Sequence, residues 1–250
     1  MSTQPAAPGA APLSSAPPAK LSTALPTELA RPIATTLAAF EASRAAGADE
    51  DVHMVAAVVD CVVSALSAPG ALVADPFAGF GTTLARAAAL GRRTFGVELL
   101  PERVELVRRL VPSAQVIEGD ARELLRLART ATPTVDAGSV DLILTSPPYM
   151  TANNHPADPL TAYEHDTGDY ARYLAELGLV AAQCARLVRP GGFVVWNVAD
   201  ILHHGHTTHL IVDCGKVLDR HFTRVGVTEI AWNVYPHDLV ADALLVFQRQ

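Results

Sequence analysis

Beyond Gly70, the chain alternates short apolar runs with longer segments whose apolar residues recur at helical spacing. The apolar runs predict β-strands at residues 71–75, 94–99, 115–118, 140–144 and 193–198. The segments between them predict helices at residues 82–90, 101–110, 120–129, 169–188 and 210–218. The last apolar runs, at 225–232 and 243–247, predict two strands joined by a loop. This order predicts an α/β fold, with a doubly wound sheet that is mostly parallel and has an antiparallel C-terminal edge strand.

The chain before Gly70 predicts two helices that pack on the flank of this core. The first has apolar residues at helical spacing, at Leu29, Ile33, Leu37 and Phe40. Its candidate cap is Thr27, its stop is Gly47, and Pro32 has to lie in its first turn or kink it. The second helix is predicted over residues 52–66, where recurring valines form a wide apolar face.

Composition predicts one globular domain behind a tail. Residues 1–25 are rich in Ala and Pro and are expected to be disordered, which leaves 26–250 as the folded domain. Half of the 250 residues are hydrophobic (50%), enough for one sizeable core. Because no apolar run has the length of a membrane span and the start lacks a secretory signal, we expect a cytoplasmic protein that does not contact a membrane. The widely spaced cysteines predict core residues rather than disulfides or metal ligands: Cys61, Cys184 and Cys214.

Polar residues close the predicted strands at regular intervals, about one strand-plus-helix unit apart: Asp75, Glu98, Asp120 and Ser146. In a doubly wound sheet these positions share one edge, where ligands bind. Gly79 and Gly81 follow the first of them and allow a ligand to approach the backbone closely. Glu98 is placed to accept hydrogen bonds from ribose hydroxyls, and Asp120 from an adenine amino group. The loop is not a dinucleotide-binding sequence, because Leu84 stands where the third glycine would be.

A ligand with a ribose, an adenine and an amino-acid head would use all of these features, and S-adenosylmethionine is such a ligand. The amides at the start of the following helix suit its carboxylate. The alternative for each of the three carboxylates is ordinary helix capping. The candidate cofactor-binding residues are Asp75, Phe77, Ala78, Gly79, Gly81, Thr82, Thr83, Glu98, Leu99, Asp120, Ala121 and Thr145.

The apolar run at 140–144 ends at Ser146-Pro147-Pro148-Tyr149, the candidate catalytic motif. Two consecutive prolines withhold backbone donors, so the carbonyl groups of Ser146 and Pro147 are expected to face a ligand without a sheet partner. The ring of Tyr149 offers a flat stacking surface beside them. An amino group on a planar ring would use both features. The alternative is a plain turn in which Tyr149 is a surface anchor.

These motifs resemble those of the exocyclic-amine DNA methyltransferases, which methylate cytosine N4 or adenine N6. The resemblance covers about residue 52 to the C-terminus and rests on the cofactor loop 75–83, on Gly96-Val97-Glu98 and on Thr145-Ser-Pro-Pro-Tyr149. The cofactor loop precedes the catalytic motif, as in one arrangement of that family, and the serine is similar to the cytosine-directed members. Trp232 resembles part of the family's target pocket, although Asn233 stands where a lysine is usual.

The resemblance implies a class I S-adenosylmethionine-dependent methyltransferase fold of the Rossmann-like type. It implies DNA as partner, with cytosine N4 as first choice of acceptor and adenine N6 as second. Ser146 and the Pro147 carbonyl would draw on the amine protons, while Tyr149 stacks on a base that has been extruded from the duplex. Candidate substrate-binding residues are Met150, Asn154, Trp232 and Tyr235.

Two features favour other acceptors. The net charge is −7, and the loop 151–167, expected over the substrate mouth, carries carboxylates and no Lys or Arg, so phosphate would be repelled there. The chain also leaves no room for a separate target-recognition domain. A small-molecule amine or RNA is therefore an alternative acceptor, and a non-catalytic cofactor-binding protein is a second alternative. Carboxylates that face solvent, with charge supplied by another subunit, would restore DNA as substrate; the sequence leaves the oligomeric state open.

Histidines are concentrated in the segment from His203 to His209, with His155 and His165 in the acidic loop. No carboxylate or thiol accompanies the 203–209 group closely, so we expect a solvated loop rather than a metal site. A role for one histidine in proton handling near the site stays an alternative.

Overall fold

The computed structural model describes residues 24–50, 53–152, 158–161 and 168–250. Their core is a nine-stranded sheet in the order β1-β8-β9-β6-β5-β2-β3-β4, with β7 paired to β6 outside this path. The strands are β1 (Ile33–Thr35), β2 (Leu72–Asp75), β3 (Arg93–Glu98), β4 (Gln115–Glu118), β5 (Val140–Thr145), β6 (Val188–His203), β7 (His206–Thr208), β8 (Thr223–Trp232) and β9 (Leu239–Gln248).

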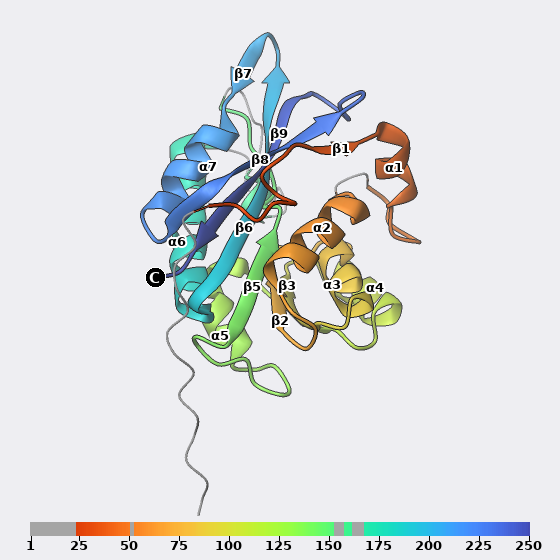
Figure 1. Ribbon diagram of the computed structural model, residues 1–250, viewed down its shortest axis with the longest axis vertical. Coiled ribbons are helices and arrows are strands. Elements are labelled where there is room, and N and C mark those ends of the chain that lie inside the picture. Colours follow the sequence, from red (N-terminus) through yellow and green to blue (C-terminus); the bar gives the residue numbers. More distant parts are fainter. Residues whose placement is uncertain (1–23, 51–52, 153–157, 162–167) are drawn as a thin grey trace, which may run out of the picture.

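Helices cover both faces of this sheet (Figure 1). They are α1 (Leu37–Ala42), α2 (Ala56–Leu66), α3 (Thr82–Ala89), α4 (Pro101–Leu110), α5 (Leu124–Ala128), α6 (Tyr170–Leu187) and α7 (Leu210–Asp219), with 3-10 turns at Ala121–Glu123 and Pro159–Thr161. Buried residues of α5, α6 and α7 form one apolar cluster with the strands. Those of α2 form a second cluster with the other side. None of the described helices is long and apolar enough to cross a membrane.

The parallel strands place their carboxyl ends together, as predicted. The neighbours β4, β3, β2, β5 and β6 all pair parallel, so the ends of β2, β3 and β5 meet at one edge of the sheet. The two C-terminal strands pair antiparallel, and β9 lies between β6 and β8. The predicted alternation of strands and helices is confirmed from β2 to α7, with boundaries that shift by a few residues at most elements.

The helix predicted over residues 26–47 is wrong in its first half. Ile33–Thr35 forms strand β1, which pairs parallel with β8 and aligns Ile33 with Ile230. The helix begins only after Thr36, whose Oγ1 accepts a hydrogen bond from the Ala39 amide at 3.0 Å, so Thr27 is not its cap. Spacing of four residues suits a helix, but two of its apolar positions here belong to a turn and a strand.

The loop predicted over His203–His209 is also wrong. Strand β6 extends to His203, and β7 returns beside it so that His203 lies opposite His206. His204 and Gly205 make the turn with positive φ angles of 48° and 77°, as two-residue hairpins require. β6 is longer than predicted because β9 pairs with it as far as Ile201.

Candidate active site

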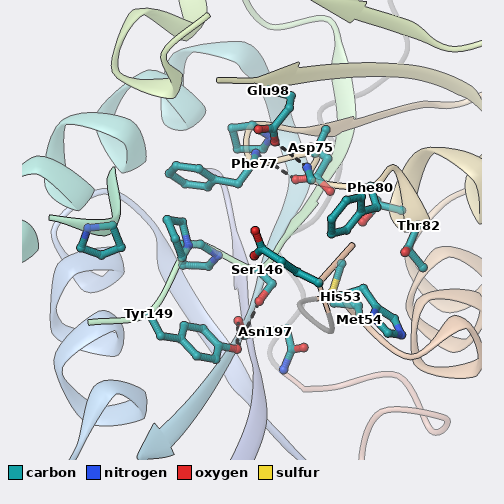
Figure 2. A pocket seen from close by; sticks show the side chains of 18 of the residues that line it. His53, Met54, Asp75, Phe77, Phe80, Thr82, Glu98, Ser146, Tyr149 and Asn197 are labelled. Atoms are coloured by element: carbon teal, nitrogen blue, oxygen red, sulfur yellow. Dashed lines mark hydrogen bonds between the residues drawn. The ribbon is translucent and has the colours of Figure 1, made fainter. Parts of the chain in front are cut away.

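The two predicted motifs face one pocket of about 740 Å³ at the carboxyl ends of the central strands. Asp75 and Glu98 lie at one end and Tyr149 lies at the other, with Ser146 between them (Figure 2). The arrangement that the sequence predicted, with the carboxylates and the diproline motif in one groove, is therefore present.

Asp75, the last residue of β2, connects the two halves of the site. Its Oδ1 accepts hydrogen bonds from the Thr145 hydroxyl at 2.5 Å and from the Phe77 amide at 3.0 Å. Only 3% of the residue is exposed, and burial raises the pKa of Asp75 to about 6. No cationic side chain in the described part of the chain forms an ion pair with this carboxylate, although it faces a pocket wide enough for a ligand.

Glu98, at the end of β3, holds the glycine loop in place. Its Oε2 accepts from the Gly79 amide at 2.7 Å and its Oε1 from the Leu100 amide at 3.0 Å. Gly79 has a positive φ of 52°, and a side chain added there would meet only one atom, 4.0 Å away. The loop therefore presents its backbone to open space beside a buried carboxylate.

Asp120, beyond β4, lines the pocket, and its carboxylate already has hydrogen-bond partners within the protein. Its carboxylate accepts from the Arg122 guanidinium at 2.5 Å, and Arg122 also bonds Glu176 at 2.7 Å. Asp120 Oδ1 also accepts from the Arg122 amide at 2.8 Å. The side chain thus caps the 3-10 turn that follows, which was the alternative considered for this residue.

Most of the predicted cofactor-binding residues line the pocket: Asp75, Phe77, Ala78, Gly79, Thr82, Thr83, Glu98, Leu99, Asp120 and Ala121. Gly81 and Thr145 do not. A Cβ on Gly81 would lie 2.8 Å from Val107 of α4, so this glycine allows α4 to pack against the loop. Thr145 is fully buried and acts on the site through its bond to Asp75.

The diproline corner carries a chain of hydrogen bonds whose direction can be worked out. The Tyr149 hydroxyl donates to the backbone carbonyl of Asn197 at 3.1 Å, and a carbonyl can only accept. The 3.1 Å bond between Tyr149 and Ser146 is therefore donated by Ser146. With its proton directed at Tyr149, the Ser146 oxygen presents lone pairs to the pocket.

A hydrogen bond from helix α6 holds the diproline segment in position. The Tyr173 hydroxyl, on α6, donates to the carbonyl of Pro148 at 2.9 Å. Among the described residues, none donates to the carbonyl oxygen of Pro147, and this residue lines the pocket together with Ser146, Pro148 and Tyr149. The Pro147 carbonyl therefore lies at the pocket without a donor among the described residues.

Only some of the predicted substrate-binding residues line the pocket. Trp232, at the end of β8, lines the pocket. Met150 does not, because it is 1% exposed and packs in the core beneath the sheet edge. Tyr235 is not among the residues that line the pocket, and its ring lies 6.5 Å from that of Trp232. Asn154 lies outside the described residues.

Sequence reasoning missed residues at the Tyr149 end of the pocket, which is the predicted substrate half. Asp242 on β9 and Asn197 on β6 line it and are bonded to each other at 2.6 Å. Phe40 contributes an aromatic wall, stacked on His53 at 4.2 Å and edge-on to Trp232 at 5.9 Å. The available signal for Asp242 was a lone carboxylate inside an otherwise apolar final strand.

The charges around the pocket do not form a cationic surface. The arginines that line it are Arg103 and Arg122, and both are paired with carboxylates, Arg103 with Glu50 at 2.9 Å. Asp158 of the acidic loop is buried and accepts from the Leu160 amide at 2.9 Å; the loop's other carboxylates, Glu164 and Asp166, lie outside the described residues.

The histidine segment places one side chain, His203, at the pocket. His209 pairs with Asp200 at 3.1 Å, at the start of α7. In the part of the chain that the structure describes, no three His, Cys, Asp or Glu residues come together as metal ligands. His155 and His165 lie outside it.

Known proteins match this chain in sequence and in fold. A family model described as DNA methylase matches residues 54–109, which hold the cofactor loop and its flanking helices. The chain is 35% identical over 144 residues to a 4-amino-L-phenylalanine/4-methylamino-L-phenylalanine methyltransferase of Streptomyces pristinaespiralis. The match covers 54% of this chain and 44% of the relative, so the chain spans less than half of that relative's length.

Solved structures share the fold at low identity. A 1,6-didemethyltoxoflavin-N1-methyltransferase of Burkholderia thailandensis, with bound 1,6-didemethyltoxoflavin and S-adenosylhomocysteine, has a TM-score of 0.52 at 17% identity, over 86% of this chain and 85% of its own. A magnesium protoporphyrin IX methyltransferase of Synechocystis PCC 6803, with bound S-adenosylmethionine, has a TM-score of 0.51 at 15% identity, over 78% and 79%. These matches confirm the predicted resemblance to the DNA methylase family and the predicted class I S-adenosylmethionine-dependent methyltransferase fold.

Proposed function

We propose that this chain is an S-adenosylmethionine-dependent N-methyltransferase whose acceptor is an amine on an aromatic ring. The observation that carries the proposal is one pocket that holds the carboxylates Asp75 and Glu98 at one end and Tyr149 at the other, with Ser146 between them (Figure 2). The match to a family of DNA methylases and to a relative that methylates an aminophenylalanine supports the same chemistry.

The residues at the carboxylate end fit the cofactor. Asp75 is a buried carboxylate without a cation of its own, and the ammonium of an amino-acid head would supply one. Glu98 has lone pairs left for ribose hydroxyls, since each oxygen accepts only one backbone amide. S-adenosylmethionine, when bound, supplies a methyl group on a sulfonium centre.

The residues at the other end would activate the acceptor. An amine on an aromatic ring shares its lone pair with the ring and is a weak nucleophile. Hydrogen-bond acceptors that draw on its protons shift the nitrogen toward a tetrahedral shape and return the lone pair to it. The Ser146 oxygen and the Pro147 carbonyl would accept those protons, while the protein aligns the nitrogen with the methyl group.

For the acceptor itself, we infer a small aromatic amine. The relative from Streptomyces pristinaespiralis is named for two such substrates. The chain carries a net charge of −7, and the arginines that line the pocket are engaged by carboxylates. Binding to DNA depends on phosphate contacts from Lys and Arg, and the described pocket rim supplies none that are unpaired.

DNA cytosine N4 is the second candidate, with adenine N6 behind it, because the matched family model is one of DNA methylases. That match ends at residue 109 and so covers the cofactor loop but not the diproline corner or the aromatic wall. It bears on the methyl donor more than on the acceptor. RNA is a further alternative that the same pocket would serve.

The test is methyl transfer from labelled S-adenosylmethionine to parallel acceptors: 4-amino-L-phenylalanine, a duplex DNA mixture and total RNA. We expect label on the arylamine nitrogen and none on nucleic acid. Label on DNA cytosine would establish the second candidate. Tight cofactor binding with no transfer to any acceptor would contradict the proposal and favour a non-catalytic cofactor-binding protein.

A further inference from the structure

Asp242 is a buried carboxylate in the substrate half of the pocket. It lies on β9, the strand between β6 and β8, and is 6% exposed. Its Oδ1 accepts from the Asn197 side-chain amide at 2.6 Å, and its Oδ2 accepts from Trp232 Nε1 at 2.9 Å. No Lys or Arg among the described residues pairs with it, and the cofactor roles proposed above leave it unused.

Burial of an ionised carboxylate at this position is energetically unfavourable unless another group compensates for its lost hydration. Removing an ionised carboxylate from water is strongly unfavourable, and here burial raises the pKa of Asp242 to about 6. Three neutral donors, Asn197, Trp232 and the Ala243 amide, favour the charged form only in part. Each carboxylate oxygen accepts one side-chain donor, and a carboxylate has about four lone-pair positions, so acceptor capacity remains.

Asp242 also belongs to the same network as the diproline corner. Asn197 links the two, since its backbone carbonyl accepts from Tyr149 and its side chain donates to Asp242. The charge of Asp242 is close enough to raise the pKa of Tyr149, second only to burial among the causes. Ser146, Tyr149 and Asp242 therefore surround one volume.

We propose that Asp242 is the catalytic base of the methyl transfer: it, rather than the Pro147 carbonyl, accepts a hydrogen bond from the acceptor amine beside Ser146 and then takes the proton of that bond. This inference rests on the proposed function and assigns it a residue. As the nitrogen lone pair forms the N–C bond, the bond from the methyl carbon to sulfur breaks and sulfur keeps that electron pair. The nitrogen is then cationic, one of its protons moves to Asp242, and the product leaves as a neutral N-methylamine.

The role also restricts the substrate. A buried carboxylate beside an aromatic wall suits a primary or secondary arylamine, which has an N–H to donate. A tertiary amine has none and would leave the remaining lone pairs of the carboxylate without a donor. We therefore expect N,N-dimethylated arylamines to be neither substrates nor competitive ligands of comparable affinity.

Other titratable groups lie near Asp242, and the test has to distinguish their ionisation from that of Asp242. Tyr149 and Tyr235 lie near its charge, and Glu229 on β8 lies opposite Ala243. The histidines His53, His203 and His237 line the same pocket, and Asp75 lies at its cofactor end. All of them remain in a variant that changes Asp242 alone.

The experiment is the pH profile of the turnover rate for Asp242→Asn and the unchanged protein, at saturating S-adenosylmethionine and 4-amino-L-phenylalanine. We expect the rate of the unchanged protein to rise with pH through about 6, and the variant to lose that rise and fall about a hundredfold in rate. Affinity for S-adenosylhomocysteine should stay unchanged, whereas the melting temperature should fall, because the asparagine has one acceptor oxygen for the two donors Asn197 and Trp232. The matched control is Glu229→Gln, an exposed carboxylate on the neighbouring strand β8 that is not among the residues lining the pocket, which should keep both rate and profile.

An active variant that keeps the rise near pH 6 would overturn the inference. If Asp242→Asn fails to fold, Trp232→Phe decides, because losing the Nε1 donor should shift the rise to higher pH; an unshifted rise would also overturn it. Absence of transfer by the unchanged protein to any of the acceptors tested above would instead overturn the proposed function.

Discussion

Ser146 and Tyr149 share one hydrogen bond, and its direction follows from the second bond that Tyr149 makes. Burial raises the pKa of Tyr149 far above its usual range, so its hydroxyl stays protonated. Its proton goes to the Asn197 carbonyl, and Ser146 must donate in turn. A serine that could act as donor or acceptor is thereby fixed as an acceptor for an incoming amine.

This arrangement predicts different outcomes for two substitutions of Tyr149. Tyr149→Phe keeps the ring for stacking but frees the Ser146 proton, and the loss of a bond of about 1 kcal/mol lowers the rate about fivefold. Tyr149→Ala removes the stacking surface as well and should abolish transfer. Single-turnover methyl transfer measures both effects.

Cofactor affinity is the control for both Tyr149 variants. Calorimetry with S-adenosylhomocysteine should give nearly unchanged affinity, because the contacts of Asp75 and Glu98 do not involve Tyr149. A large loss of cofactor binding in Tyr149→Ala would mean that the two halves of the pocket have been assigned the wrong way round.

Asp75 predicts a pH dependence at the other end of the pocket. Burial raises its pKa to about 6, so the side chain is neutral below that pH and a carboxylate above it. An ammonium head binds the carboxylate better, so the affinity for S-adenosylhomocysteine should weaken as the pH falls from 7.5 to 5. Calorimetry across this range should show the loss, and Asp75→Asn should bind weakly with little change across it. If the affinity of Asp75→Asn varied with pH as strongly as that of the unchanged protein, the titration of another group would be responsible.

At the scale of elements, the periodic pattern of apolar residues was enough to identify strands and helices wherever a segment forms one regular structure. It identified the alternating strands and helices from Leu72 onward, since each buried strand is a short apolar run between turn residues. It failed at Ile33, which is in a strand only because the distant residue Ile230 pairs with it, and pairing of this kind leaves no local pattern. It also failed at His206, which pairs with His203 across a two-residue turn at His204 and Gly205; there the glycine was a local turn signal that the interpretation as a loop did not use.

Gly81 gives a prediction about the packing of the cofactor loop on α4. Its φ is +82°, and an added Cβ would lie 2.8 Å from Val107. Gly91 has a similar φ of +77° but nothing within 4 Å, so Gly91→Ala is a matched control for the backbone cost. Gly81→Ala should be less stable than Gly91→Ala by about 1–3 kcal/mol, the usual cost of overpacking, as measured by urea unfolding. Equal losses would show that α4 yields to the side chain.

For the whole molecule, the sequence located one half of the site better than the other. The cofactor half is built from residues that follow strands in chain order, so spacing alone placed Asp75 and Glu98 at one edge. The substrate half is assembled from Phe40, Asn197 and Asp242, which the chain brings together from its first helix and two late strands. No spacing rule connects these positions, and Asp242 fell in the loop predicted before the last strand, whereas β9 begins at Leu239.

The most direct measurement is a crystal structure with S-adenosylhomocysteine and an arylamine bound together. We predict the adenosine and its amino-acid head beside Glu98 and Asp75, and the amine nitrogen within hydrogen-bond distance of the Ser146 oxygen and the Asp242 carboxylate. The arylamine ring should lie against Tyr149. An amine bound away from the Ser146–Tyr149 corner, or a nucleoside bound in the substrate half, would contradict the account.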